Sequence, residues 1–217
     1  MLNIGLTSRT LHGTTVAEAA DTMQRAGFRA TELTFTHTDL DGWRYNGMGD
    51  LTGITGSRVR AACDEFRHRG IEVVSLGMFT DLRNPDKGVR QKHIDYAKRY
   101  IDFAASADVR YIATECGFTE GHRGISDITY ESDYQNLKDS LREICLEAGK
   151  AGVQIALEGS VFDIIPSPRR QKTLIEELES ECHVRLSTLL DPASYIHNSD
   201  EEGMFYYLKH DIGYVHG

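Results

Sequence analysis

Apolar residues along this chain follow two spacings in turn, an alternating one typical of strands and a three-to-four-residue one typical of helices. The clearest helical segment is Val16–Ala26, whose apolar residues recur on one helical face. Thr15 and Glu18 fit the S/T-x-x-E pattern of a capping box, and Gly27 follows the last turn. The pattern therefore predicts a capped helix that ends at Gly27.

The same helix ending occurs three times along the chain. The sequences RAGF, HRGI and KAGV place a glycine and then an apolar residue after a helical segment, at Gly27, Gly70 and Gly152. A left-handed glycine cap with a hydrophobic contact explains this pattern. An apolar, strand-like segment follows each glycine within a few residues. The chain is thus expected to repeat a helix–turn–strand unit.

Strands and helices are expected to alternate along the whole chain. The strands are predicted at Asn3–Ser8, Thr31–Phe35, Glu72–Met78, Arg110–Cys116, Gln154–Gly159, Arg185–Asp191 and Ile212–His216. The helices are predicted at Val16–Ala26, Ser57–Arg69, Val89–Ala107, Glu131–Gly149, Arg169–Glu181 and Glu202–His210. Such alternation predicts parallel strands joined by helical crossovers. No change of composition marks a linker, so we expect one α/β domain over residues 1–217.

Two architectures satisfy this order of elements, an open doubly wound sheet and a closed (β/α)8 TIM barrel. The first strand–helix turn, SRTLHGTT, contains no GxGxxG pattern, and the chain contains no P-loop. The lack of both phosphate-binding motifs therefore disfavours an open sheet that binds nucleotides. A TIM barrel would place its chemistry at the carboxyl ends of its strands.

Charge and composition narrow the classes of partner. The net charge of −9 repels nucleic-acid phosphates and anionic membranes. No apolar run reaches the length of a membrane span, and we see no signal peptide at the start of the sequence. Four widely spaced cysteines indicate free thiols in a reducing, cytoplasmic setting: Cys63, Cys116, Cys145 and Cys182. We therefore expect neither nucleic-acid nor membrane partners. Association of the chain with copies of itself into a homo-oligomer stays open.

Four chemically active side chains stand at the ends of consecutive predicted strands. They are Glu115, Glu158, Asp191 and His216. In a barrel they would converge on one mouth. Glu158, Asp191 and His216 together suit a divalent cation such as Mn²⁺, Mg²⁺, Co²⁺ or Zn²⁺. Such a cation polarises sugar oxygens, and the carboxylates can move protons at carbon.

Each of these residues also has a purely structural interpretation. Glu158 could cap the next helix, and Asp191 before Pro192 could be a turn or N-cap residue. His216 alone could be a surface histidine, and Glu115 could pair with a neighbouring arginine. Their coincidence at consecutive strand ends favours the joint metal site.

Several segments, in this order, resemble the xylose-isomerase-like TIM barrels, a family of sugar and sugar phosphate isomerases and epimerases. They are IGLTSRTL, AGFRATELTF with Glu32, ALEG, LLDPAS and YVHG. The spacings of 33 residues from Glu158 to Asp191 and 25 from Asp191 to His216 are similar to those between the metal ligands of the ketose 3-epimerase branch. The resemblance implies these three residues as ligands, with Glu158 also an acid/base.

The resemblance also implies a small ketose or polyol as substrate. Polar residues on the early loops and on the fourth strand are expected to orient its hydroxyl groups: His12, His37 and Glu115. On this hypothesis the protein is a metal-dependent sugar isomerase or epimerase.

Two departures from the family pattern bear directly on the candidate site. The family has a fourth ligand, a glutamate at the end of strand eight that serves the epimerases as second acid/base, whereas seven strands are predicted here. We therefore expect a TIM barrel that is incomplete in or after strand seven, and an active enzyme if the missing segment is supplied. The family's histidine three residues after the strand-six aspartate is replaced by Ser194.

The sequence leaves other functions open. The chain could be an inactive or fragmentary family member that binds a ligand or a partner. A hydro-lyase acting on inositol-derived ketones would share the fold and the metal. A DNA-repair role like that of endonuclease IV is disfavoured by the net charge of −9.

Overall fold

A seven-stranded parallel sheet forms the centre of the computed structural model, which describes residues 3–118 and 123–217. Its strands are β1 (Gly5–Thr7), β2 (Ala30–Leu33), β5 (Glu72–Gly77), β6 (Tyr111–Glu115), β7 (Gln154–Glu158), β8 (Leu186–Leu190) and β9 (Ile212–Val215). They lie side by side in this order, and every neighbouring pair is parallel. All seven predicted strands are confirmed.

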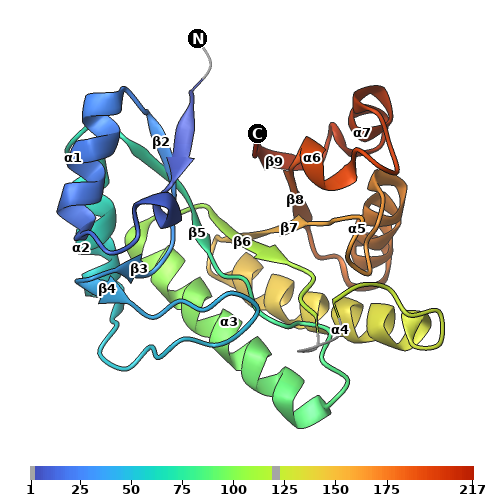
Figure 1. The fold of residues 1–217 in the computed structure, drawn as a ribbon. Coiled ribbons are helices and arrows are strands. Elements are labelled where there is room, and N and C mark those ends of the chain that lie inside the picture. The colour runs from blue at the N-terminus through green and yellow to red at the C-terminus, as the bar shows by residue number, and fades with distance from the viewer. Residues whose placement is uncertain (1–2, 119–122) are drawn as a thin grey trace.

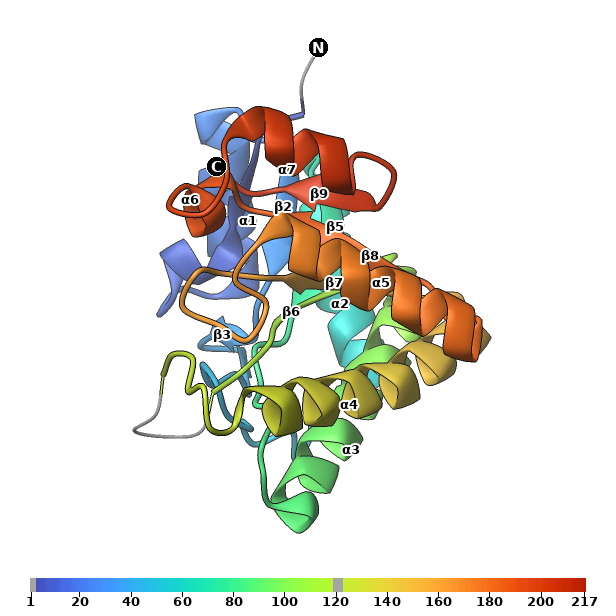
Figure 2. The same ribbon diagram turned by 90° about the vertical axis from the view of Figure 1, so that its right-hand side faces the viewer.

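Helices cover the outer side of this curved sheet (Figure 1 and Figure 2). They are α1 (Val16–Ala26), α2 (Gly56–Arg67), α3 (Lys87–Ala107), α4 (Tyr130–Lys150), α5 (Pro168–Cys182) and α7 (Glu201–Leu208). All six were predicted. The pattern missed four short elements: the 3₁₀ helix η1 (Ser8–Leu11), the hairpin strands β3 (Thr36–His37) and β4 (Leu40–Asp41), and α6 (Pro192–Tyr195). Elements of two to four residues are too short to show a periodicity.

Local capping explains how the helices begin and end. Thr15 accepts a hydrogen bond from the Glu18 N–H and donates its own N–H to the Glu18 carboxylate, which confirms the capping box of α1. Gly27, Gly70 and Gly152 have φ values of 86°, 72° and 73°, in the left-handed region that glycine adopts without a steric penalty. These glycines let the chain turn back at once into the next strand.

The main core lies between the sheet and its helices. Phe35 and Tyr100 are fully buried there, and their rings stack with centroids 4.9 Å apart. A smaller core lies on the other face of the sheet and consists of Phe79, Tyr111, Ala113, Ala156 and Leu189. The two cores share the strands, whose side chains alternate between the faces.

The barrel is open on one side. β1 and β9 are the two edges of the sheet, and no strand pairs with either outer edge within the described ranges. Figure 1 shows these edges facing each other. A cavity of about 600 Å³ lies along this opening and is lined by Glu32, Asp191, Tyr214 and His216, among others. The seven strands therefore form the incomplete TIM barrel that was expected.

None of the helices among the described residues is long and apolar enough to cross a membrane.

Two leucines on α4 offer a matched test of the core. Leu141 is fully buried, whereas Leu146 is 45% exposed. We expect Leu141→Ala to lower the free energy of unfolding by about 2–5 kcal/mol because it removes packed methyl groups and leaves a cavity. Leu146→Ala should change it by less than about 0.5 kcal/mol. Urea denaturation followed by circular dichroism measures both, and equal effects would contradict this placement of α4.

Candidate active site

The carboxyl ends of four neighbouring strands carry the residues predicted to be active. Glu115 ends β6 and Glu158 ends β7, and the two are partners in the sheet register. Asp191 directly follows β8, and His216 directly follows β9. The His216 N–H donates to the Leu190 carbonyl over 2.9 Å, which holds His216 beside the end of β8. The structure therefore brings all four to one rim of the barrel.

Hydroxyl groups hold the two glutamates of this rim. Ser194 Oγ donates to Glu158 Oε1 over 3.0 Å, and the Tyr45 hydroxyl donates to Glu115 Oε2 over 2.7 Å. Burial and the nearby charge of Glu115 raise the pKa of Glu158 to about 7, against the lowering effect of His216. Burial also raises the pKa of Glu115. Glu158 can therefore take up and release a proton near neutral pH, as general acid–base catalysis requires.

A buried carboxylate, Glu32 at the carboxyl half of β2, contacts His216. The Tyr214 hydroxyl donates to Glu32 Oε2 over 2.7 Å, and Ser75 Oγ donates to the Tyr214 hydroxyl over 2.9 Å. The same Glu32 oxygen lies 3.5 Å from His216 Nε2. Burial lowers the pKa of His216, but the hydrogen bond and charge of Glu32 and the charge of Glu158 outweigh it and raise the pKa overall. Glu32 thus connects β2 to β9 through the inside of the open barrel.

Asp191 has a structural role in addition to its place at the rim. Its Oδ1 accepts the Ala193 N–H over 2.9 Å, so Asp191 is the N-cap of α6, as its alternative interpretation proposed. Glu158, Asp191 and His216 supply the oxygen and imidazole donors that divalent cations prefer. Among residues 3–118 and 123–217, however, no three His, Cys, Asp or Glu side chains form a ready metal cluster. The metal site stays a prediction.

The two histidines expected to orient the substrate line a separate cavity, which none of the four rim residues lines. His37 is fully buried on β3, and among residues 3–118 and 123–217 neither of its ring nitrogens has a hydrogen-bond partner. Burial lowers its pKa. His12 follows η1, and both histidines line a cavity of about 390 Å³ together with Arg9 and Trp43. Their role in substrate binding remains a prediction.

Asp163, in the loop between β7 and α5, was missed by the sequence analysis. It is only 1% exposed, and within the described ranges neither of its carboxyl oxygens has a hydrogen-bond partner. Burial and the charge of Glu115 raise its pKa to about 7, although Arg123 and Arg83 act in the opposite direction. The only sequence signal was an acid between apolar residues, in VFDII.

Aromatic rings next to Glu115 were missed as well. Trp43 and Phe79 have centroids 6.1 Å apart, and so have Tyr45 and Phe118. Tyr45 also contacts Phe79 at 6.4 Å and so joins the two pairs. Ligand pockets commonly combine such apolar walls with a few polar groups. These rings come from three different loops, so no local motif could have revealed them.

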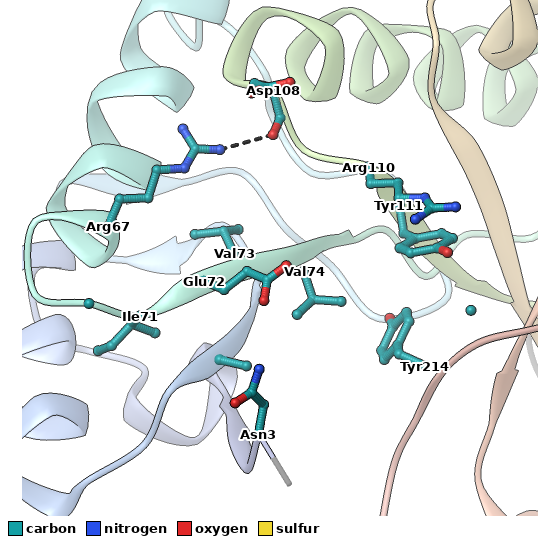
Figure 3. A pocket seen from close by; sticks show the side chains of 13 residues that line it. Asn3, Arg67, Ile71, Glu72, Val73, Val74, Asp108, Arg110, Tyr111 and Tyr214 are labelled. Carbon is teal, nitrogen blue, oxygen red and sulfur yellow. Dashed lines mark hydrogen bonds between the residues drawn. The ribbon is translucent and has the colours of Figure 1, made fainter. Parts of the chain in front are cut away.

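A third cavity, of about 680 Å³, lies at the opposite end of the strands. Figure 3 shows Glu72, Tyr111 and Tyr214 around it, together with the bond from Arg67 to the Asp108 carbonyl. The four rim residues do not line it. In TIM barrels this amino-terminal face serves stability rather than chemistry. The candidate active site is therefore the rim with Glu158.

The fold and the rim together define a TIM barrel with its polar side chains at the carboxyl ends of the strands. The family description "Xylose isomerase-like TIM barrel" matches residues 20–217, and the chain belongs to this family. Comparison with curated proteins gives no significant match.

Solved structures with the same fold include two sugar epimerases. An L-ribulose 3-epimerase superposes with a TM-score of 0.77 at 17% identity, covering 100% of this chain and 69% of that chain. A D-psicose 3-epimerase studied in the presence of D-fructose superposes with a TM-score of 0.76 at 12% identity, covering 99% of this chain and 72% of that chain. The IOLI protein with a bound zinc atom superposes with a TM-score of 0.72 at 15% identity, covering 99% of this chain and 72% of that chain. At these identities the likeness shows the fold.

Removing the hydroxyl group of Tyr214 tests the network around Glu32. We expect Tyr214→Phe to lower the free energy of unfolding by about 1–3 kcal/mol because a buried carboxylate loses a donor. Tyr206→Phe is the matched control, since Tyr206 is 71% exposed, and should change it by less than about 0.5 kcal/mol. Urea denaturation compares the two, and a neutral Tyr214→Phe would rule out a stabilising network.

The raised pKa of Asp163 predicts that the free energy of unfolding depends on pH. A carboxyl group whose pKa is higher in the folded than in the unfolded chain destabilises the fold increasingly from its unfolded pKa of about 4 up to its folded pKa of about 7. Relative to wild type, Asp163→Asn should therefore gain stability from about pH 4 to about pH 7 and then level off.

Thermal unfolding across this pH range measures the effect, with the exposed Asp102→Asn as control. A difference between Asp163→Asn and wild type that does not vary with pH would contradict the raised pKa of Asp163.

Proposed function

We propose that this protein is a divalent-metal-dependent sugar isomerase or epimerase that acts on a small ketose or polyol by proton transfer at carbon. One observation carries the proposal: Glu115, Glu158, Asp191 and His216 converge at the carboxyl rim of a TIM barrel of this family. The pKa of Glu158, about 7, supports its use as acid and base.

The residues of the rim have different roles in the proposed reaction. Glu158, Asp191 and His216 would hold the cation, which when bound polarises a carbonyl or hydroxyl oxygen of the sugar. Glu158 takes a proton from the carbon next to the carbonyl, and Ser194 keeps its carboxylate in place. The rings around Tyr45 offer an apolar wall for the sugar.

The named relatives support the substrate class. An L-ribulose 3-epimerase and a D-psicose 3-epimerase share this fold, and both are named for small ketoses. The rim of this chain combines carboxylates, an imidazole and aromatic rings, which suit a small polyhydroxylated molecule.

A second candidate is a protein that binds a sugar-like ligand or a partner without catalysis. It is favoured by the contact of His216 with Glu32, which engages the imidazole, and by the two unpaired sheet edges among the described strands. A hydro-lyase of an inositol-derived ketone is a third, because it would use the same base and cation.

Two measurements separate these functions. Isothermal titration calorimetry with Mn²⁺, Co²⁺, Zn²⁺ and Mg²⁺ should show binding to wild type, and weaker binding to Glu158→Gln. Proton NMR in D₂O with L-ribulose or D-fructose should show loss of a carbon-bound proton signal. Glu158→Gln should slow this exchange by about 10²–10⁴-fold because it removes the base.

Glu179→Gln, an exposed change on α5, is the control for both measurements. Metal binding without exchange would favour the non-catalytic candidate, and loss of water from an inositol-derived ketone would favour the hydro-lyase. If neither metal binding nor proton exchange is observed, the proposed function is excluded.

A further inference from the structure

The loop that follows β4 closes on itself at its base. The backbones of Gly42 and Gly49 lie so close together that a Cβ added to Gly49 would collide with the Gly42 carbonyl. The buried Tyr96 of α3 holds this base, because its hydroxyl donates to the Gly42 carbonyl over 3.0 Å and accepts the Gly49 N–H over 3.3 Å. Residues 42–49 therefore form an Ω loop, a compact surface loop whose ends meet.

The tip of this Ω loop is fastened to the loop after β6 by one asparagine. Asn46 Nδ2 donates to the Phe118 carbonyl over 2.6 Å, and Asn46 Oδ1 accepts the Phe118 N–H over 2.8 Å. We call these two hydrogen bonds the clamp. Asn46 also has a φ of 53°, in the left-handed region that asparagine tolerates better than other non-glycine residues. Asparagine thus suits this position by its amide and by its backbone.

Two aromatic rings of the Ω loop belong to the wall beside Glu115. The Tyr45 hydroxyl donates to Glu115 Oε2 over 2.7 Å, and the Tyr45 ring contacts the Phe118 ring with centroids 6.1 Å apart. The Trp43 ring contacts the Tyr45 ring at 6.3 Å. Tyr45 directly precedes Asn46 in the chain. The clamp therefore fixes the backbone from which Tyr45 reaches Glu115.

We propose that Asn46 is a positioning residue of the candidate active site, which clamps the Ω loop so that Tyr45 holds Glu115 and presents its ring to the substrate. This inference rests on the proposed function and adds to it a group that does not itself touch the sugar. Tyr96 already holds the base of the loop, so the clamp orders the tip alone. The tip is the part that contacts Glu115. Substrate binding therefore depends on the clamp.

Fluorescence tests whether the clamp holds the tip, because Trp43 is the only tryptophan of the chain. Asn46→Gly removes the amide but still permits a left-handed backbone. In the ligand-free protein we expect acrylamide to quench Trp43 about twofold more strongly in Asn46→Gly than in wild type, since a freed tip exposes the ring. Gln135→Ala, an exposed change on α4, should leave the quenching unchanged. Equal quenching in Asn46→Gly and wild type would overturn the inference.

Proton exchange tests whether the clamp serves substrate binding. With the Mn²⁺-loaded protein and L-ribulose or D-fructose in D₂O, Asn46→Gly should raise KM about tenfold because both hydrogen bonds of the clamp are lost. Its kcat should stay within about threefold of the wild-type value, since Glu158 is untouched. Tyr45→Phe, which removes only the hydroxyl bond to Glu115, should raise KM as well but leave the quenching of Trp43 unchanged.

The outcomes separate the inference from the proposed function. A lower kcat at an unchanged KM in Asn46→Gly would show a merely structural effect, and would overturn the inference while leaving the proposed function intact. Absence of exchange in wild type with both ketoses would remove the proposed function for these sugars, and the role of Asn46 in binding them. If Asn46→Gly fails to fold, Asn46→Asp gives the same two readouts, since it loses the donor to the Phe118 carbonyl and keeps the acceptor.

Discussion

The geometry of the mouth depends on the hydrogen bond between Tyr214 and the buried carboxylate of Glu32. A buried carboxylate is costly unless donors satisfy it, and here Tyr214, supported by Ser75, supplies them. The bond joins β9 to β2 across the interior, although these strands are not neighbours in the sheet. The outer edges of β1 and β9 do not pair with each other, so this bond adds a link across the open side to the pairing with β8 that already holds β9 and His216.

A second constraint is the crowding of acids at the rim. Parallel register makes Glu115 and Glu158 neighbours, and the loop after β7 brings Asp163 close to Glu115. Burial and mutual repulsion favour the protonated forms of these groups. The same arrangement that makes the acids costly to ionise makes them able to exchange protons near neutral pH and attractive to a cation. Raised pKa values of this kind concentrate at functional sites.

Particular residues show why some of the site could be predicted from the sequence. Glu158 and Asp191 directly follow apolar runs, so their places at strand ends could be derived from alternation alone. The capping box at Thr15 and the glycine at Gly27 are likewise local signals, and both are confirmed. Asp163 and the ring of Trp43 carry no such signal, because their neighbours in space are distant in the chain.

By itself the sequence determined the order of seven strands and six helices, and the candidate residues at four consecutive strand ends. Periodicity and capping are properties of neighbouring residues, so they can be read without the fold. Only the tertiary structure decided that Glu32 contacts His216 and hydrogen-bonds Tyr214, 182 residues away, and that Glu115 faces the same side as Glu158. Such contacts arise from sheet curvature and register, which no spacing along the chain records.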